Sequence, residues 1–215
     1  SPTNEKASAR RNYAKTQAFN LPNRMEPDYR TTLTEVRLYV KAPGGAWKLQ
    51  EAGSPLLGEF QCRVPGDGEY WYTLQTVERS GKASPADVNL EGPSQRVIVD
   101  TQAPVIQVQT SNLPDGDLCL QCTITDANPD PASLKAVCKT PTGELPLEIL
   151  PGQPGSFRVR GPELLKHPIL VMGMDMAKNV GTKEVSLRDM IGTTVNVNAS
   201  PKSVSDVNVL SGLPI

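Results

Sequence analysis

The chain has 215 residues, of which 22 are basic and 23 acidic, for a net charge of −1. The two signs are mixed along the chain, which excludes the basic stripe that a nucleic-acid-binding protein uses. No apolar run approaches the roughly 18 residues that a membrane-spanning helix needs. Hydrophobic residues make up 38% of the chain, and 20 Pro and 17 Gly are spread through it. This composition favours many short strands separated by turns.

The first half of the chain predicts a polar arm followed by a β-sandwich. Residues 1–17 hold little that can be buried, which is typical of an arm or linker. From Ala18 onward, apolar and polar residues alternate in strand-length runs, so one face of each strand is expected to be buried and the other wet. We expect a domain over residues 18–101, with strands in "EVRLYVK" (35–41), "GGAWKLQ" (44–50), "GEFQCRV" (58–64), "GEYWYTLQTVE" (68–78) and "SQRVIVD" (94–100).

A second series of strands begins after the proline-containing joint "DTQAP" (100–104) and predicts another sandwich over residues 103–190. The two halves repeat each other, because aligning Val77 with Met174 superposes two strand–turn–strand segments. The fold class predicted is therefore all-β, with two sandwich domains in tandem. The strands expected in the second domain are "VIQVQT" (105–110), "DLCLQCTITD" (117–126), "SLKAVCKT" (133–140), "LPLEIL" (145–150), "SFRVRG" (156–161), "ILVMGMD" (169–175) and "TKEVSL" (182–187).

Two stretches carry a family resemblance. "DGEYWYTLQTVERSGKAS" (67–84) and "VMGMDMAKNVG" (171–181) resemble the penultimate strand and hairpin of bacterial immunoglobulin-like and fibronectin type III-like modules. "VIVDTQAPVI" (97–106) resembles the junction between such modules in envelope proteins. The resemblance implies a corner hydrogen bond from Tyr70 to nearby backbone, whereas His167 occupies the matching position in the second copy. It also implies a periplasmic, cell-surface or secreted location.

The sequence predicts no catalytic residues, and we expect the protein not to be an enzyme. A Ser-His-Asp or Cys-His arrangement would have to use His167, which precedes a proline at the head of a predicted strand. No glycine-rich phosphate loop and no G-x-S-x-G sequence occurs.

One loop has the spacing of a calcium-binding segment. In "TDANPDP" (125–131), Asp126, Asn128 and Asp130 stand at alternate positions, as oxygen ligands do in calcium loops. Pro131 and Val137 occupy the places of the glycine and glutamate of an EF-hand. Asx-turns produce the same composition without a metal. Calcium is thus a weak candidate, and no other cofactor is expected.

The cysteines leave two alternatives open. Cys119 and Cys122 lie three apart on a predicted strand and point to opposite faces, which argues against a shared metal. Cys122 and Cys138 are both expected to face the core from strands of opposite sheets. They either form a disulfide across the core or remain buried free thiols, which pack as small apolar groups.

Alternation also places Trp71 and Tyr39 on the outer face of the first domain, flanked by Arg37 and Lys41. Such aromatic surfaces bind sugar rings or anchor partner proteins. The competing interpretation is that the arm, the tail or the neighbouring domain covers them.

The sequence as a whole predicts a structural or protein-interaction module whose partner is a protein or a glycan. Alternative functions are a carbohydrate-binding accessory module and a subunit of a larger assembly held by its terminal tails. The C-terminal tail, residues 191–215, supports the assembly alternative. Val195 and Val197 alternate with Asn there, as do Val207 and Val209, and such a segment can add itself to an open sheet edge.

Overall fold

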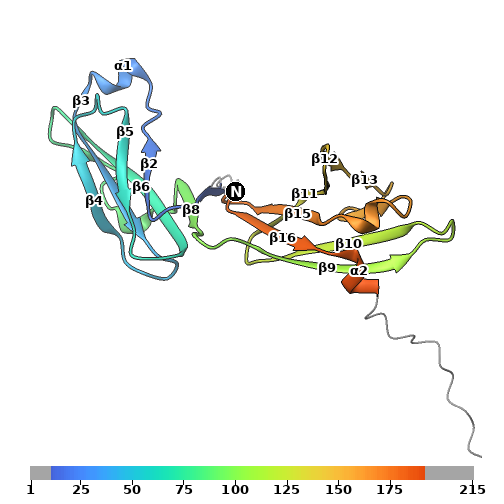
Figure 1. Cartoon of the computed structure of the whole chain (residues 1–215). Coiled ribbons are helices and arrows are strands. Elements are labelled where there is room, and N and C mark those ends of the chain that lie inside the picture. The colour runs from blue at the N-terminus through green and yellow to red at the C-terminus, as the bar shows by residue number, and fades with distance from the viewer. Residues whose placement is uncertain (1–10, 192–215) are drawn as a thin grey trace, which may run out of the picture.

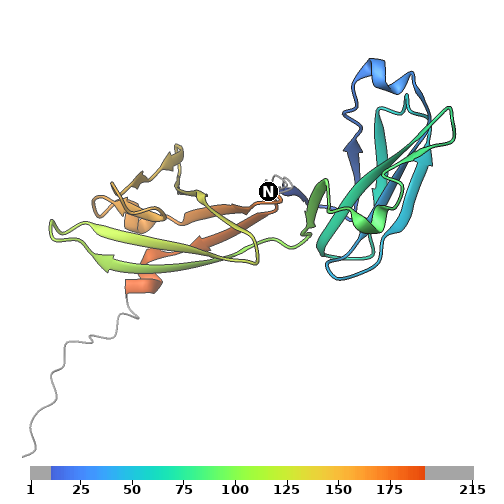
Figure 2. The same ribbon diagram turned by 180° about the vertical axis from the view of Figure 1, so that it is seen from behind.

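The computed structural model describes residues 11–191 of the chain. Two β-sandwich domains follow one another, residues 11–99 and 105–191, and they meet at the joint formed by residues 100–104 (Figures 1 and 2). The predicted all-β fold with two tandem sandwiches is confirmed. No helix within residues 11–191 is long and apolar enough to cross a membrane. The C-terminal residues 192–215, with the strand pairing predicted for their valines, lie outside the described residues.

Domain 1 packs a large sheet, in the order β1-β8-β6-β3-β4 with β7 paired to β6, against a two-stranded sheet of β2 and β5. Its elements are β1 (Arg11–Ala14), β2 (Ala18–Pro22), α1 (Pro27–Arg30), β3 (Leu33–Lys41), β4 (Lys48–Gly53), β5 (Glu59–Arg63), β6 (Gly68–Glu78), β7 (Ala83–Ser84), the 3-10 turn η1 (Val88–Leu90) and β8 (Gln95–Val99).

The core of domain 1 follows from the period-two pattern of its strands. Val36 of β3, Phe60 of β5 and Tyr72 of β6 are almost completely buried between the two sheets. Removing such side chains from water is the main favourable term in forming the sandwich, at about 1.5–3 kcal/mol for each large apolar group. The predicted corner bond is present, because the Tyr70 hydroxyl donates to the Gly66 carbonyl at 2.9 Å.

The N-terminal boundary of domain 1 differs from the prediction. Residues 11–14 were expected to belong to a polar arm, but they form β1, which pairs in parallel with β8. This pairing is made by main-chain groups and needs few apolar side chains, so the hydrophobic pattern did not reveal it. Ala14 packs against the core and its carbonyl accepts a hydrogen bond from the Asp100 N–H at 3.0 Å.

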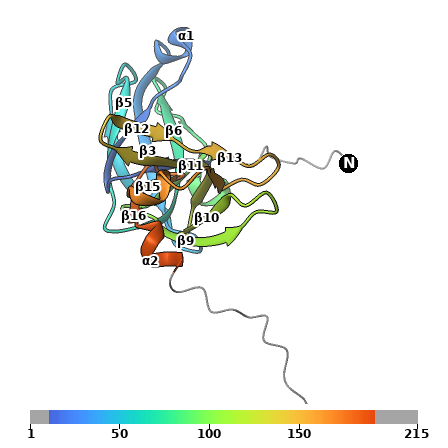
Figure 3. The same ribbon diagram turned by 45° about the vertical axis from the view of Figure 1, so that its right-hand side comes forward.

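Domain 2 packs two four-stranded sheets, β13-β14-β10-β9 and β12-β11-β15-β16. Leu120 of β10, Phe157 of β14 and Ile169 of β15 are buried at its centre. The single turn α2 packs beside β9 (Figure 3). The elements are β9 (Val105–Asn112), β10 (Leu118–Thr125), β11 (Pro129–Thr140), β12 (Gly143–Pro146), β13 (Glu148–Ile149), β14 (Ser156–Val159), η2 (Leu164–Lys166), β15 (Ile169–Asp175), β16 (Val180–Val185) and α2 (Leu187–Ile191).

The two domains share one strand arrangement. The penultimate strand, β6 or β15, lies between the last strand and β3 or β11, as in immunoglobulin-like and fibronectin III-like sandwiches. The sequence offset that aligns Val77 with Met174 also aligns their hairpin turns. The Glu78 N–H donates to the Lys82 carbonyl at 2.9 Å in domain 1, and the Asp175 N–H donates to the Asn179 carbonyl at 3.2 Å in domain 2.

Candidate metal centre at the domain joint

Asp100, the first residue after β8, is held by hydrogen bonds from domain 2. The side-chain amide of Asn128 donates to its carboxylate at 2.8 Å, and that of Asn179 donates to its backbone carbonyl at 2.7 Å. The Gln102 N–H donates to the other carboxylate oxygen at 3.2 Å. The joint is therefore fixed by direct contacts between the last residue of one sandwich and two loops of the next.

The second of these loops is the tight turn after β15, which Asp175 organises. Its carboxylate accepts from the Asn179 backbone N–H at 2.8 Å and from the Asn179 amide at 2.6 Å. Lys178 takes a left-handed backbone conformation with φ of 71°, and its N–H bonds to the Asp175 carbonyl at 3.1 Å. Asp175 is fully buried, which leaves its charge dependent on these donors.

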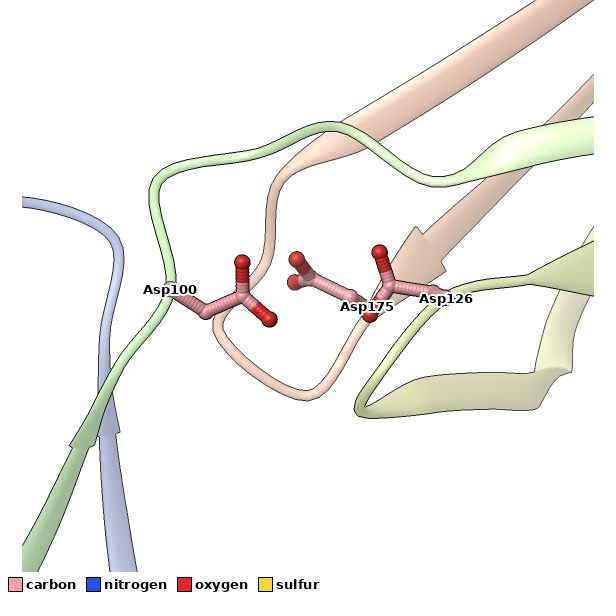
Figure 4. Close-up of side chains that lie close together, drawn as sticks. All are labelled: Asp100, Asp126 and Asp175. Atoms are coloured by element: carbon pink, nitrogen blue, oxygen red, sulfur yellow. The ribbon is translucent and has the colours of Figure 1, made fainter. Parts of the chain in front are cut away.

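Three carboxylates converge at the joint (Figure 4). One oxygen each from Asp100, Asp126 and Asp175 lies within 4.8 Å of the others. Asp100 and Asp175 are both more than nine-tenths buried, and Asp126 is half-buried. Asp100 directly follows the last strand of domain 1, whereas Asp126 follows β10 and Asp175 ends β15, so the cluster links the joint to two loops of domain 2.

No basic side chain within residues 11–191 forms an ion pair with this cluster. The nearest lysine in sequence, Lys178, binds Asp130 at 3.1 Å. At an effective dielectric constant of about 20, two unit charges about 5 Å apart repel by about 3 kcal/mol. A cation would offset that repulsion for all three pairs together.

The chemistry of the cluster fits a hard divalent cation. All three donors are carboxylate oxygens, which Ca²⁺ and Mg²⁺ prefer, and the larger Ca²⁺ tolerates irregular geometry. The amides of Asn128 and Asn179 present their NH₂ groups to the acids, and either amide, turned by a half rotation, presents its oxygen instead. An open cleft of about 600 Å³, lined by Asp67, Glu69, Asp126 and Asn128 among others, leads to the cluster from solvent.

The structure separates the three residues predicted as calcium ligands. Asp126 belongs to the cluster, and its carboxylate also accepts the Asn128 N–H at 2.7 Å, which makes an Asx-turn. Asn128 reaches the cluster through its bond to Asp100. Asp130 points elsewhere and pairs with Lys178. The Asx-turn interpretation of the loop is thus present in the structure, and the calcium interpretation stays a prediction.

The four cysteines are free thiols, so the structure contains no disulfide between Cys122 and Cys138. Both belong to the core of domain 2, and the Cys138 thiol is directed to the Leu164 carbonyl at 3.9 Å. Burial raises the pKa of Cys122 to about 12. Cys119 faces away from that core as expected but is buried on the outer face. Buried thiols packed as small apolar groups are the second of the two alternatives that the sequence left open.

Cationic side chains of the same sheet contact the outer aromatic residues, which are half-buried. Trp71 lies between Lys41 and Arg96 across adjacent strands, with Lys41 Nζ 5.4 Å and Arg96 Cζ 5.0 Å from the ring centroid. Lys41 also stands 4.5 Å from the centroid of Trp47. Trp71 is half-buried, and a sugar ring stacked on it would have to displace these cations, so binding at this surface stays a prediction.

The other two residues predicted for this surface are also occupied. Arg37 is bound to Glu35 at 2.7 Å, and the Tyr39 hydroxyl donates to Gln75 at 3.3 Å. Gln75 is itself buried although it faces outward. Among residues 11–191, the side chains that contact this surface belong to the same sheet.

Sequence reasoning missed Asp100 and Asp175 as members of the cluster. Each stands at the end of an apolar strand, in "VIVD" and "VMGMD". The offset between the repeats places Glu78 opposite Asp175, so the acid at the strand end recurs. What the sequence did not show was that Asp100 folds back over domain 2.

Comparisons with known proteins found similar solved structures at low sequence identity. No protein-family model matches the sequence, and no curated protein matches it. Among solved structures, the fibronectin(III)-like modules of Clostridium thermocellum CbhA are 14% identical, with a TM-score of 0.46, over 85% of this chain and 90% of that one. A tetra-tandem repeat from the extending region of a large adhesion protein is 15% identical, with a TM-score of 0.31, over 72% of this chain and 41% of that one. The chain itself folds as two β-sandwiches in tandem.

Proposed function

We propose that this protein is a non-enzymatic spacer of the cell envelope or the extracellular space, and that its two sandwiches are held in a fixed orientation by a calcium ion at their joint. The main support for this proposal is the convergence of three acids at the joint. Carboxylate oxygens of Asp100, on the side of domain 1, and of Asp126 and Asp175, in domain 2, lie within 4.8 Å of one another. A cation bound there would act on the orientation of the domains as well as on their stability.

The direct hydrogen bonds across the joint support the spacer role independently of the ion. Asn128 and Asn179 both donate to Asp100, so two contacts restrain the five-residue segment 100–104. A short segment containing proline is stiff, and restrained ends reduce its remaining freedom. Extracellular calcium modules function at millimolar free calcium, where weak sites of few charged ligands are filled.

Calcium binding is tested on the full chain by thermal unfolding and isothermal titration, in chelator and then in millimolar Ca²⁺. A ligand at 100 times its Kd stabilises the folded state by about 2.7 kcal/mol, which for a domain of this size raises Tm by roughly 10 °C or more. Asp126→Asn keeps the acceptor of the Asx-turn but removes one charge, so the calcium-induced rise in Tm is expected to shrink markedly.

Asp130→Asn is the matched control, because Asp130 lies four residues after Asp126, in β11, and pairs with Lys178 outside the cluster. Its response to calcium should equal that of the unmodified chain. Equal responses in the two variants would place the ion elsewhere, and no response in the unmodified chain would exclude it from the joint.

Spin-relaxation measurements test the spacer role separately, since rigidly joined domains share one tumbling time.

A further inference from the structure

Strand β2 of domain 1 is an unpaired sheet edge. Within residues 11–191 it pairs with β5 alone. The Val64 N–H donates to the Gln17 carbonyl and the Asn23 N–H to the Gly58 carbonyl, both at 2.9 Å, so the odd-numbered residues of this segment bond to the β5 side. The main-chain groups of Ala18 and Asn20 therefore point to the open side.

Most of these outward groups have no partner among the described residues. The Ala18 carbonyl accepts the Thr16 hydroxyl at 2.6 Å. The N–H groups of Ala18 and Asn20, with the carbonyls of Asn20 and Pro22, form no hydrogen bond within residues 11–191. Such a row of free donors and acceptors is a template for an added strand.

A groove lies along this edge. It has a volume of about 430 Å³ and separates β2 from the β1–β8 side of the larger sheet. The side chains of Phe19 and Leu21 reach it from β2, and those of Tyr13 and Val97 reach it from β1 and β8. Leu21 and Val97 belong to the core of domain 1, so the groove opens into the space between its two sheets.

Domain 2 shows what fills the equivalent place. There, β10 and β14 correspond to β2 and β5, and β9 pairs along the outer edge of β10. In domain 1 the first strand, β1, pairs with β8 instead, which leaves the place of β9 vacant among the described residues. Strand β9 has the sequence "VIQVQT", with Ile106 and Val108 directed to the core and Gln107 and Gln109 directed outward.

Two segments outside the described residues have this alternation, and the one around Val207 and Val209 also contains the charged Asp206. Residues 193–199, "TTVNVNA", place Val195 and Val197 on one face and Asn196 and Asn198 on the other, without a charge. Residues 1–10, "SPTNEKASAR", have no apolar side chain larger than alanine that alternates in this way. The segment 193–199 is thus the part of the chain suited to a groove lined by Phe19, Leu21 and Val97.

The length of chain between the end of α2 and Val195 is too short to bring Val195 to the groove of the same chain. Strand β16 begins beside Asn179 at the joint and runs away from it for six residues, or about 20 Å, before α2 begins. Val195 follows the end of α2 by four residues, which span at most about 14 Å. The groove lies beyond the joint, in domain 1.

We therefore propose that β2 accepts residues 193–199 of a second copy of this chain as an added strand, which joins copies head to tail. Each copy then offers one donor segment and one acceptor edge, and a heterologous contact of this kind forms open chains of molecules. The inference goes beyond the spacer role and needs no ion at the joint, so its tests are made in chelator.

The acceptor is tested with Asn20→Pro in the full chain, by light scattering over a range of concentrations. Proline removes the Asn20 N–H, which points away from β5, and so blocks the edge without removing a bond of the β2–β5 pair. Asn20→Ala is the matched control, because it also loses the bond from the Asn20 amide to Glu59 but keeps the N–H. We expect multiples of 23.2 kDa for the unmodified chain and for Asn20→Ala, and at least ten-fold weaker association for Asn20→Pro.

The donor is tested with the double change Val195→Asp and Val197→Asp, which leaves residues 11–191 untouched and should weaken association to the same degree. Mixing this donor-defective chain with Asn20→Pro leaves one intact donor and one intact acceptor, so we expect a complex of two chains that does not grow further. A chain that stays monomeric at high concentration overturns the proposal. So does hydrogen-exchange protection of the Asn20 amide that survives the double change, since another segment would then occupy the edge.

Discussion

The side-chain amide of Asn179 bridges the two domains, because it donates to the Asp100 carbonyl at 2.7 Å and to the buried Asp175 carboxylate at 2.6 Å. One side chain thus couples the turn that closes the β15–β16 hairpin to the last residue of domain 1. Loss of this amide affects both the stability of domain 2 and the orientation of domain 1.

Replacing Asn179 with Ala is expected to lower the free energy of unfolding of domain 2 by about 2 kcal/mol, because a fully buried carboxylate loses a donor. Chemical unfolding monitored by circular dichroism measures this change. Asn89→Ala is the control, since the Asn89 amide bonds to Asp87 at an exposed site, and it should stay within about 0.5 kcal/mol of the unmodified chain. Equal effects of the two changes would contradict the bridging role.

Gly181→Ala is expected to disturb the joint from the side of the linker. A Cβ atom at this position would lie 2.0 Å from the Pro104 carbonyl oxygen, so the linker or β16 must move. Overpacking of this kind costs about 1–3 kcal/mol, and small-angle scattering should record a changed domain orientation. Gly92→Ala, where a Cβ atom has no neighbour within 4 Å, serves as the control and should leave both readouts unchanged.

Stability is expected to fall with rising pH above about 9, because of the buried thiols. Burial raises the pKa of Cys62 and of Cys122 from the ordinary 9.0 to about 12. Between those values the unfolded chain releases thiol protons that the folded chain retains, so each thiol lowers the unfolding free energy by up to about 1.4 kcal/mol per pH unit. Cys122→Ala should reduce this slope between pH 9 and pH 12, and a slope that does not change would refute the assignment.

Lys41→Gln is expected to destabilise domain 1 by about 0.5–1 kcal/mol, because the Lys41 ammonium stands over both Trp47 and Trp71. Thermal unfolding and the tryptophan emission spectrum both report on this change. Lys48→Gln, on the exposed edge strand β4, is the matched control and should alter neither. If Lys48→Gln lowered the stability as much as Lys41→Gln does, the contact of the Lys41 ammonium with the two tryptophan rings would add nothing to stability.

The sequence was sufficient to predict strands whose two faces differ, and insufficient where main-chain groups alone hold a segment. Period-two runs such as that around Tyr72 specify which face is buried, so both sandwiches and the joint between them were predictable. Strand β1 was not, because "RNYA" shows no apolar alternation and is recruited by β8.

The candidate site was predictable only in part, for a related reason. Asp126 stands in a loop with a recognisable spacing, whereas Asp100 and Asp175 join it through the path of the linker and the turn after β15. The cover over Trp71 likewise depends on the register that sets Lys41 and Arg96 beside it. Register is a property of paired strands, and a single strand's pattern does not specify it.

The parallel pairing of β1 with β8 has a mechanical consequence. These are the first and last strands of domain 1, and four residue pairs from Arg11↔Arg96 to Ala14↔Val99 hold them side by side. Tension applied between the two ends of this domain pulls the strands past each other, so the hydrogen bonds share the force in shear and must break together. Within residues 11–191 no such pairing joins β9 to β16, the first and last strands of domain 2. A stretched molecule should therefore open its second domain first while the first still bears the force.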